Sequence, residues 1–186
     1  MSDSLRLFFA LPLPEAALET LVAAQARAKA VASRLSPRWT KTEQMHVTLK
    51  FLGQLPGNAL PRLEEILATR AAAAQPFDAT LSQVTAFGGR RARVLVVELA
   101  TESPVLAALA TGLDEDAAAL GVARETRPFR AHVTLARFKH PGDARAVIDA
   151  AEVAPVPVSC GELRLYRSEL TPSGSRYTPV AARALG

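Results

Sequence analysis

The chain contains few of the residues that would indicate a disulfide-stabilised or membrane protein. It has one cysteine, Cys160, in 186 residues, so it has no internal disulfide and no Cys-x-x-Cys metal or redox pair. Its apolar opening, Leu5 to Leu13, is too short to span a bilayer and is interrupted by Pro12. We therefore expect a cytoplasmic protein with no signal peptide, no transmembrane helix and no membrane partner.

Lysine is also scarce, and nearly all the positive charge is carried by arginine. Apolar residues make up 49% of the chain and charged residues 22%, which is enough hydrophobic material to offset the chain entropy lost on folding. The formal net charge is +4. Arginine suits phosphate because its planar group forms bidentate hydrogen bonds. The composition therefore permits a polyanionic partner without requiring one.

The apolar periodicity predicts the same order of elements twice. Alternating or β-branched segments predict strands at residues 6–12, 45–52, 77–87, 94–99, 131–138, 156–166 and 175–181. Segments rich in helix formers predict helices at residues 14–35, 58–74, 104–120 and 143–151. Strand, helix, His-Val-Thr-Leu strand, helix and strand thus recur at a nearly constant offset, which indicates an internal duplication.

We therefore expect an α+β fold in which residues 1–186 form a single bilobed domain. The internal repeat covers approximately 5–90 and 93–182. Each of two pseudo-symmetric, duplicated lobes would be an antiparallel sheet packed with helices, with the active-site cleft between them. No linker rich in Pro, Ser or Gly separates the copies, which favours one compact unit.

Two of the three histidines open identical His-Val-Thr-Leu tetrapeptides at equivalent points of the two copies. Side chains alternate between the faces of a strand, so His46 and Thr48 share one face, and His132 and Thr134 do the same in the second copy. Lobes facing each other across a two-fold axis would bring both pairs into one cleft.

Two imidazoles in one cleft suit paired proton transfer, with one acting as base and the other as acid. At their ordinary pKa they would give a bell-shaped pH dependence between about pH 5 and 8. In-line displacement at phosphorus needs one such group on the attacking side and one on the leaving side. Thr48, Thr134 and Arg137 are candidates for binding the non-bridging phosphate oxygens, where charge is held in the transition state.

The face on which Arg137 lies depends on the regularity of its strand, because Arg137 follows His132 by five residues. Strict alternation would place the two side chains on opposite faces, and only a bulge or the end of the strand would turn Arg137 toward the cleft. The alternative is an exposed arginine at a strand end.

Other interpretations of the histidines stay open at this point. A lone strand histidine is often a half-buried structural residue, although the repetition of His-x-Thr favours function. Zinc would need further ligands, and no Asp, Glu or Cys recurs near either motif, so we expect no metal and no cofactor. Cys160 lies in a strand-like segment without a nearby histidine, which disfavours a nucleophilic thiol.

The paired motifs resemble the His-x-Thr/Ser-x signature of the 2H phosphoesterase superfamily. The surrounding segments are similar to the bacterial and archaeal RNA 2′,3′-cyclic phosphodiesterases, long named 2′-5′ RNA ligases, over nearly the whole chain. These segments are Arg6-Leu-Phe-Phe-Ala, Trp39 before His46, His-Val-Thr-Leu-Lys-Phe-Leu-Gly53, Arg127-Pro-Phe-Arg-Ala-His-Val-Thr-Leu-Ala-Arg137 and Leu165-Tyr-Arg-Ser168.

The resemblance implies a bilobed α+β fold and metal-independent hydrolysis of an RNA-terminal or nucleotide 2′,3′-cyclic phosphate to a 2′-phosphate. It also implies that His46 protonates the departing 3′-oxygen and that His132 activates water. The residues alone do not assign these roles, because the two copies look alike. The expected partners are RNA with 2′,3′-cyclic phosphate ends or cyclic nucleotides, and the expected state is a monomer.

Two other hypotheses stay open from the sequence. The same histidines could run the reaction in reverse as a 2′-5′ RNA ligase, because one step deprotonates the attacking hydroxyl and the other protonates what leaves. A non-catalytic RNA-binding module would use the histidines only to contact phosphate. Loss of catalysis without loss of RNA binding in a His→Ala variant separates the enzymes from the binding module.

Overall fold

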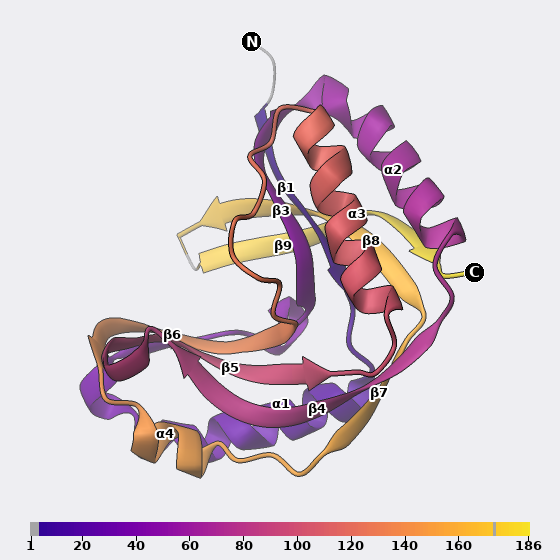
Figure 1. Ribbon diagram of the computed structural model, residues 1–186. Helices are drawn as coiled ribbons and strands as arrows, with labels where there is room; N and C mark the ends of the chain where they lie inside the picture. Colours follow the sequence, from indigo (N-terminus) through magenta and orange to yellow (C-terminus); the bar gives the residue numbers. More distant parts are fainter. Residues whose placement is uncertain (1–3, 173) are drawn as a thin grey trace.

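The computed structural model describes residues 4–172 and 174–186, and within them nine strands form one curled antiparallel sheet with helices packed on it (Figure 1). The strands are β1 (Ser4–Leu11), β2 (Pro37–Trp39), β3 (Val47–Pro56), β4 (Phe77–Phe87), β5 (Ala92–Ala100), β6 (His132–Gly142), β7 (Val156–Cys160), β8 (Glu162–Thr171) and β9 (Gly174–Ala184). The α-helices are α1 (Glu15–Lys29), α2 (Leu60–Ala72), α3 (Val105–Ala119) and α4 (Arg145–Ala150). Short 3₁₀ turns are η1 (Ser33–Leu35), η2 (Thr42–Gln44), η3 (Gly57–Ala59) and η4 (Gly89–Arg91).

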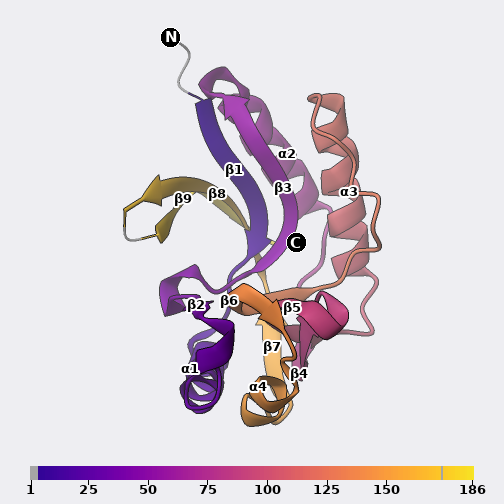
Figure 2. The same ribbon diagram turned by 90° about the vertical axis from the view of Figure 1, so that its left-hand side faces the viewer.

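The sheet divides into two halves at the contact between β3 and β6. The strand order is β7-β4-β5-β6-β3-β1-β8-β9, and β2 pairs with β6. Only one register pair, Val47 with Val133, joins β3 to β6. Helices α2 and α3 pack against the half that contains β3, and α1 and α4 pack against the half that contains β6. Figure 2 shows β1 and β3 running upright above β5 and β6.

This arrangement confirms the α+β class with an antiparallel sheet, but the two sequence copies do not form separate halves. Strand β4, from the first copy, pairs with β5 of the second, and β8 of the second copy pairs with β1 of the first. Helix α3 likewise packs against β3. Sheet pairing therefore mixes the copies, and a single bilobed domain with a repeat over 5–90 and 93–182 stays a prediction.

Some element boundaries differ from the sequence prediction for identifiable reasons. The strand expected over 156–166 is two strands, β7 and β8, which break at Gly161 and pair at opposite ends of the sheet. The helix expected over 14–35 ends at Lys29 and is followed by η1. Ser36 then adopts a left-handed φ of 44°, which redirects the chain into the short strand β2.

Strand β1 contributes to two separate hydrophobic clusters, because its side chains alternate between the faces of the sheet. Leu7, Phe9 and Leu11 belong to the main core beneath the helices. On the opposite face, Phe8 and Tyr166 form a smaller cluster with Ala10, against which Tyr177 packs. The ring of the first motif's histidine packs against this small apolar cluster.

Candidate active site

The two His-x-Thr motifs meet where the two halves of the sheet join. Val47 and Val133 are register partners, and both are fully buried on the helix-covered face. The antiparallel direction places His46 toward Thr134 and Thr48 toward His132, on the other face. The geometry thus brings both predicted pairs to one place, which we call the histidine site.

His46 is held in one orientation and one tautomer. Its Nδ1–H donates a hydrogen bond to the Gln44 carbonyl at 2.8 Å, and its Nε2 lies 2.9 Å from the Thr48 hydroxyl. Because the carbonyl only accepts, the neutral ring carries its proton on Nδ1 and leaves Nε2 as the base. The ring stacks on Phe8 at 4.8 Å and meets the Tyr177 ring edge-on at 5.4 Å.

The aromatic surroundings change the acidity of His46. Burial disfavours the charged ring and lowers its pKa from 6.5 to about 4, although the Gln44 carbonyl hydrogen bond opposes this shift. The charge of His132 makes a smaller contribution that also lowers the pKa. His46 is therefore neutral near pH 7, and its imidazolium would be an unusually strong proton donor.

His132 repeats the tautomer control of the first motif. Its Nδ1–H donates to the Arg130 carbonyl at 2.6 Å, two residues upstream, just as His46 donates to Gln44. Burial is the main cause that lowers its pKa, and the positive charges of Arg137 and Arg130 lower it as well. In both motifs Nε2 is thus the nitrogen left to exchange a proton with a bound molecule.

A bulge brings Arg137 to the histidine face. Thr134 pairs with Val96 on β5 and Ala136 with Leu95, so Leu135 has no register partner and the alternation shifts by one residue. The side chain of Arg137 therefore lies on the same face as His132, despite the odd spacing. Its influence on the His132 pKa agrees with that position.

The first motif has the same irregularity at the same place. Thr48 pairs with Ala10 and Lys50 with Phe9, which leaves Leu49 unpaired in register. Phe51 consequently lies at the position in the first motif that is equivalent to Arg137 in the second. It exposes 52% of its surface, and its ring lies 5.6 Å from the ring of Phe8. Sequence reasoning missed Phe51 as a site residue, because simple alternation assigned it to the opposite face.

Three residues that sequence reasoning also missed surround His132. Glu98 is its register partner on β5 and forms an ion pair with Arg130. The Arg130 guanidinium also lies 4.9 Å from the ring of Phe87, whose edge faces the His132 ring at 4.9 Å. Because the Arg130 carbonyl holds the imidazole, these contacts fix the orientation of His132. The register of β5 against β6, which alternation does not reveal, would have identified Glu98.

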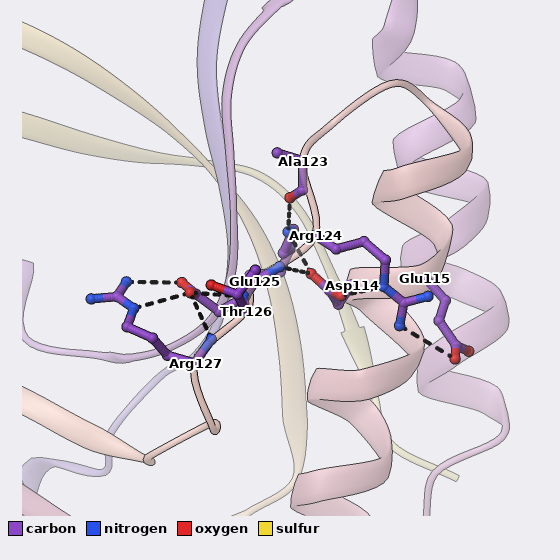
Figure 3. A network of polar contacts seen from close by, with 8 residues as sticks. Asp114, Glu115, Ala123, Arg124, Glu125, Thr126 and Arg127 are labelled. Carbon is purple, nitrogen blue, oxygen red and sulfur yellow. Dashed lines mark hydrogen bonds and ion pairs between the residues drawn. The ribbon is translucent and has the colours of Figure 1, made fainter.

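A buried ion pair beneath the sheet connects the strand of the first motif to the segment that precedes the second motif. Lys50 of β3 is 7% exposed and donates to Asp114 of α3 at 2.6 Å and to the Ala123 carbonyl at 2.8 Å. Figure 3 shows Asp114 also contacting the loop that follows α3, through Arg124 and the Glu125 backbone N–H. That loop leads to Arg130 and His132, so Lys50 links the strand after His46 to the chain segment before His132.

The remaining candidates from the sequence do not join the site. Among residues 4–172 and 174–186, no group of three or more His, Cys, Asp or Glu lies close enough to hold a metal ion. Burial, with a smaller contribution from Asp78, raises the pKa of Cys160 to about 11, so its thiol stays protonated. His140 is exposed.

Comparison with known proteins agrees with this fold. Residues 13–172 match the model of the 2′-5′ RNA ligase superfamily. A crystal structure of a Thermus thermophilus protein superimposes with a TM-score of 0.80 and 30% identity, covering 97% of each chain. The protein thus carries two His-x-Thr motifs at the centre of a curled antiparallel sheet. The chain belongs to the 2′-5′ RNA ligase superfamily.

Two curated relatives share one name, RNA 2′,3′-cyclic phosphodiesterase. The Thermus thermophilus protein is 32% identical over 187 residues, covering 94% of this chain and 87% of its own length. The Geobacillus stearothermophilus protein is 34% identical over 153 residues, covering 77% of this chain but only 46% of the relative, so this chain spans about half of that protein. Within the part of the chain that the structure describes, no helix has the length and apolar character needed to cross a bilayer.

Proposed function

We propose that this chain is an enzyme that hydrolyses a 2′,3′-cyclic phosphate, at an RNA end or in a cyclic nucleotide, to a 2′-phosphate without a metal ion. The observation that carries the proposal is the pair of imidazoles with matched tautomers. His46 and His132 each donate Nδ1–H to a backbone carbonyl and present Nε2 on one face of the sheet. The names of the curated relatives support the same substrate class.

In the proposed reaction, His132 accepts a proton from water through Nε2 as the water oxygen bonds to phosphorus. His46 donates its Nε2 proton to the 3′-oxygen as the P–O3′ bond breaks, which leaves a 3′-hydroxyl and a 2′-phosphate. One imidazole gains a proton and the other loses one, so the pair resets by exchange with solvent. Thr48, Thr134 and Arg137 hold the non-bridging oxygens, where preorganised donors act on the transition state.

The environments of the two rings support this division of roles. The stacked ring of His46 has a pKa of about 4, so its protonated form gives up a proton readily to a departing oxygen. His132 is surrounded by fewer rings and has Glu98 nearby, whose charge opposes the lowering of its pKa. It is therefore the better candidate for the base.

A direct assay tests the proposal. Purified protein is incubated with 2′,3′-cyclic AMP in EDTA, and phosphorus NMR identifies the product. We expect 2′-AMP from the wild type and none from His46→Ala or His132→Ala. A 3′-AMP product, or turnover that requires added zinc or manganese, would contradict the mechanism. RNA binding without any turnover would indicate the binding module instead.

A 2′-5′ ligase activity is the second candidate, favoured by the family that the chain matches. In that reaction a 5′-hydroxyl replaces water as the group deprotonated by His132. Hydrolysis dominates when water is the more abundant nucleophile. We also propose a cytoplasmic monomer, because a lone buried thiol suits a reducing compartment and one chain supplies both histidines.

A further inference from the structure

A strip of exposed cations continues from the histidine site along β6. Arg38 of β2 is the register partner of Arg137 on β6, and Lys139 follows two residues later. All three side chains are exposed. We call Arg38, Arg137 and Lys139 the basic strip.

The strip lies on the same face of the sheet as the histidines. Trp39, next to Arg38, pairs with Ala136 and packs against the main core on the opposite face. Phe138, between Arg137 and Lys139, is buried in that core as well. Because side chains alternate along a strand, the basic strip points away from the core and toward the histidine face.

The charges of the strip are not balanced by the protein. Like charges at opposite positions on neighbouring strands repel each other, so the Arg38 and Arg137 pairing costs stability. In residues 4–172 and 174–186, no carboxylate forms an ion pair with any of the three side chains. By contrast, Arg130 in the loop before β6 and Arg164 on β8 do have acidic partners. An external anion would relieve the repulsion.

The positive surface also extends beyond the reach of a single nucleotide. Turn η4, with Arg90 and Arg91 exposed, lies against β6 near its outer end, where Ala92 pairs with Gly142 (Figure 1). At about 3.3 Å per residue, the path from His132 to Gly142 is on the order of 30 Å. A nucleotide held by the histidines would leave most of this path unoccupied.

We propose that Arg38 and Lys139 of the basic strip bind the phosphodiester backbone of a single RNA strand whose cyclic phosphate end occupies the histidine site, beside Arg137. The inference rests on the proposed function and narrows its substrate: the preferred substrate is a single-stranded oligonucleotide, and its chain leaves the site along β6 and β2. Arginine and lysine contacts to phosphates carry no sequence information, so the preference is for length and not for base sequence.

The test compares two substrates in wild type and two double variants. The substrates are 2′,3′-cyclic AMP and a six-nucleotide RNA that ends in a 2′,3′-cyclic phosphate. The test variant is Arg38→Ala with Lys139→Ala, which spares the residues of the proposed catalytic machinery. The charge-matched control is Arg62→Ala with Arg183→Ala, exposed positions on α2 and β9. Thermal unfolding confirms that each variant is folded.

We expect the test variant to lower kcat/KM for the RNA by about tenfold and to change that for the cyclic mononucleotide less than twofold. Its slope of log kcat/KM against log salt should become shallower by about 0.7 for each phosphate that the strip no longer neutralises. Equal losses on both substrates, or losses no larger than those of the control, would overturn the inference. Absence of turnover of both substrates in the wild type would instead overturn the proposed function.

Discussion

The lowered pKa of His46 makes a specific prediction about the pH dependence of catalysis. Stacking on Phe8 and contact with Tyr177 cover much of the ring, and burial lowers its pKa from 6.5 to about 4. At about 1.36 kcal/mol per pKa unit, the shift corresponds to about 3 kcal/mol against the charged ring. At pH 7 the protonated fraction of His46 is then on the order of 10⁻³ in the free protein, compared with about one quarter at a pKa of 6.5.

In the proposed mechanism, catalysis needs one proton on the pair, so kcat/KM should follow the singly protonated form of the free enzyme. Since both histidine pKa values are lowered, the bell-shaped profile should reach its maximum below pH 6.5, with its acid limb near pH 4. This differs from the range of pH 5 to 8 expected from unperturbed imidazoles. The profile of kcat should lie at higher pH, because the bound phosphate anion favours the charged rings.

The assay is kcat/KM for 2′,3′-cyclic AMP between pH 3.5 and 9, alongside proton NMR titration of the His46 and His132 Cε1–H signals. Tyr177→Ser should admit water to the His46 ring and raise its pKa toward 6.5. Leu170→Ser, which changes an exposed side chain on the neighbouring strand β8, is the control and should leave the titration unchanged. A wild-type His46 that titrates near 6.5 would refute the reasoning from burial.

Five further outcomes follow from the same contacts. Arg137→Ala should lower kcat/KM by two to three orders of magnitude, about 3 to 4 kcal/mol, because one preorganised phosphate donor is lost; near-normal turnover of 2′,3′-cyclic AMP would leave it an exposed strand arginine. The single His46→Ala and His132→Ala variants should each lower kcat/KM by several orders of magnitude. The double variant should lower kcat/KM little further, because the two groups act in one step. A substrate with a better 3′ leaving group should rescue His46→Ala alone, and rescue of His132→Ala would reverse the roles. Lys50→Met should destabilise the fold by about 3 kcal/mol in urea unfolding, because it leaves Asp114 without its buried partner, and Lys50→Met with Asp114→Leu should recover part of that loss; an unchanged midpoint would contradict a tight pair. In wild type, folding stability should fall by at most about 3 kcal/mol as pH decreases from about 6.5 to about 4, because only the unfolded chain then protonates His46 readily, and His46→Asn should remove that part of the pH dependence.

Local patterns in the sequence were sufficient to predict the elements that carry the site. Strand β4 begins and ends where the alternation of 77–87 predicts, and the two glycines after it have positive φ values of 109° and 59°. The His-Val-Thr-Leu segments lead into or lie in β3 and β6 as expected. Alternation also predicted that each histidine shares a face with the threonine two residues later, because that pair precedes the bulge.

Features that depend on pairing between distant strands were not predictable from local pattern. Strand β4 pairs with a strand of the second copy, and β8 pairs with a strand of the first copy. These pairings depend on which strand edges come together in the folded sheet, and no local residue pattern predicts that. The bulges at Leu49 and Leu135 are visible only in the register with β1 and β5. They decide whether Arg137 reaches the histidine face, and for that reason the sequence left its role open.

The arrangement around the Val47–Val133 pair combines a symmetric frame with asymmetric surroundings. Each histidine is followed three residues later by a bulge, so the side chain five residues after it turns to the site face in both motifs. In the first motif that side chain is Phe51, which extends the aromatic cluster around His46, and in the second it is Arg137, which places a positive charge near His132. In the proposed mechanism, this frame supplies two proton carriers on one face, as in-line displacement requires. The unequal neighbours then set their acidities apart, which is the condition for one imidazole to serve as acid while the other serves as base.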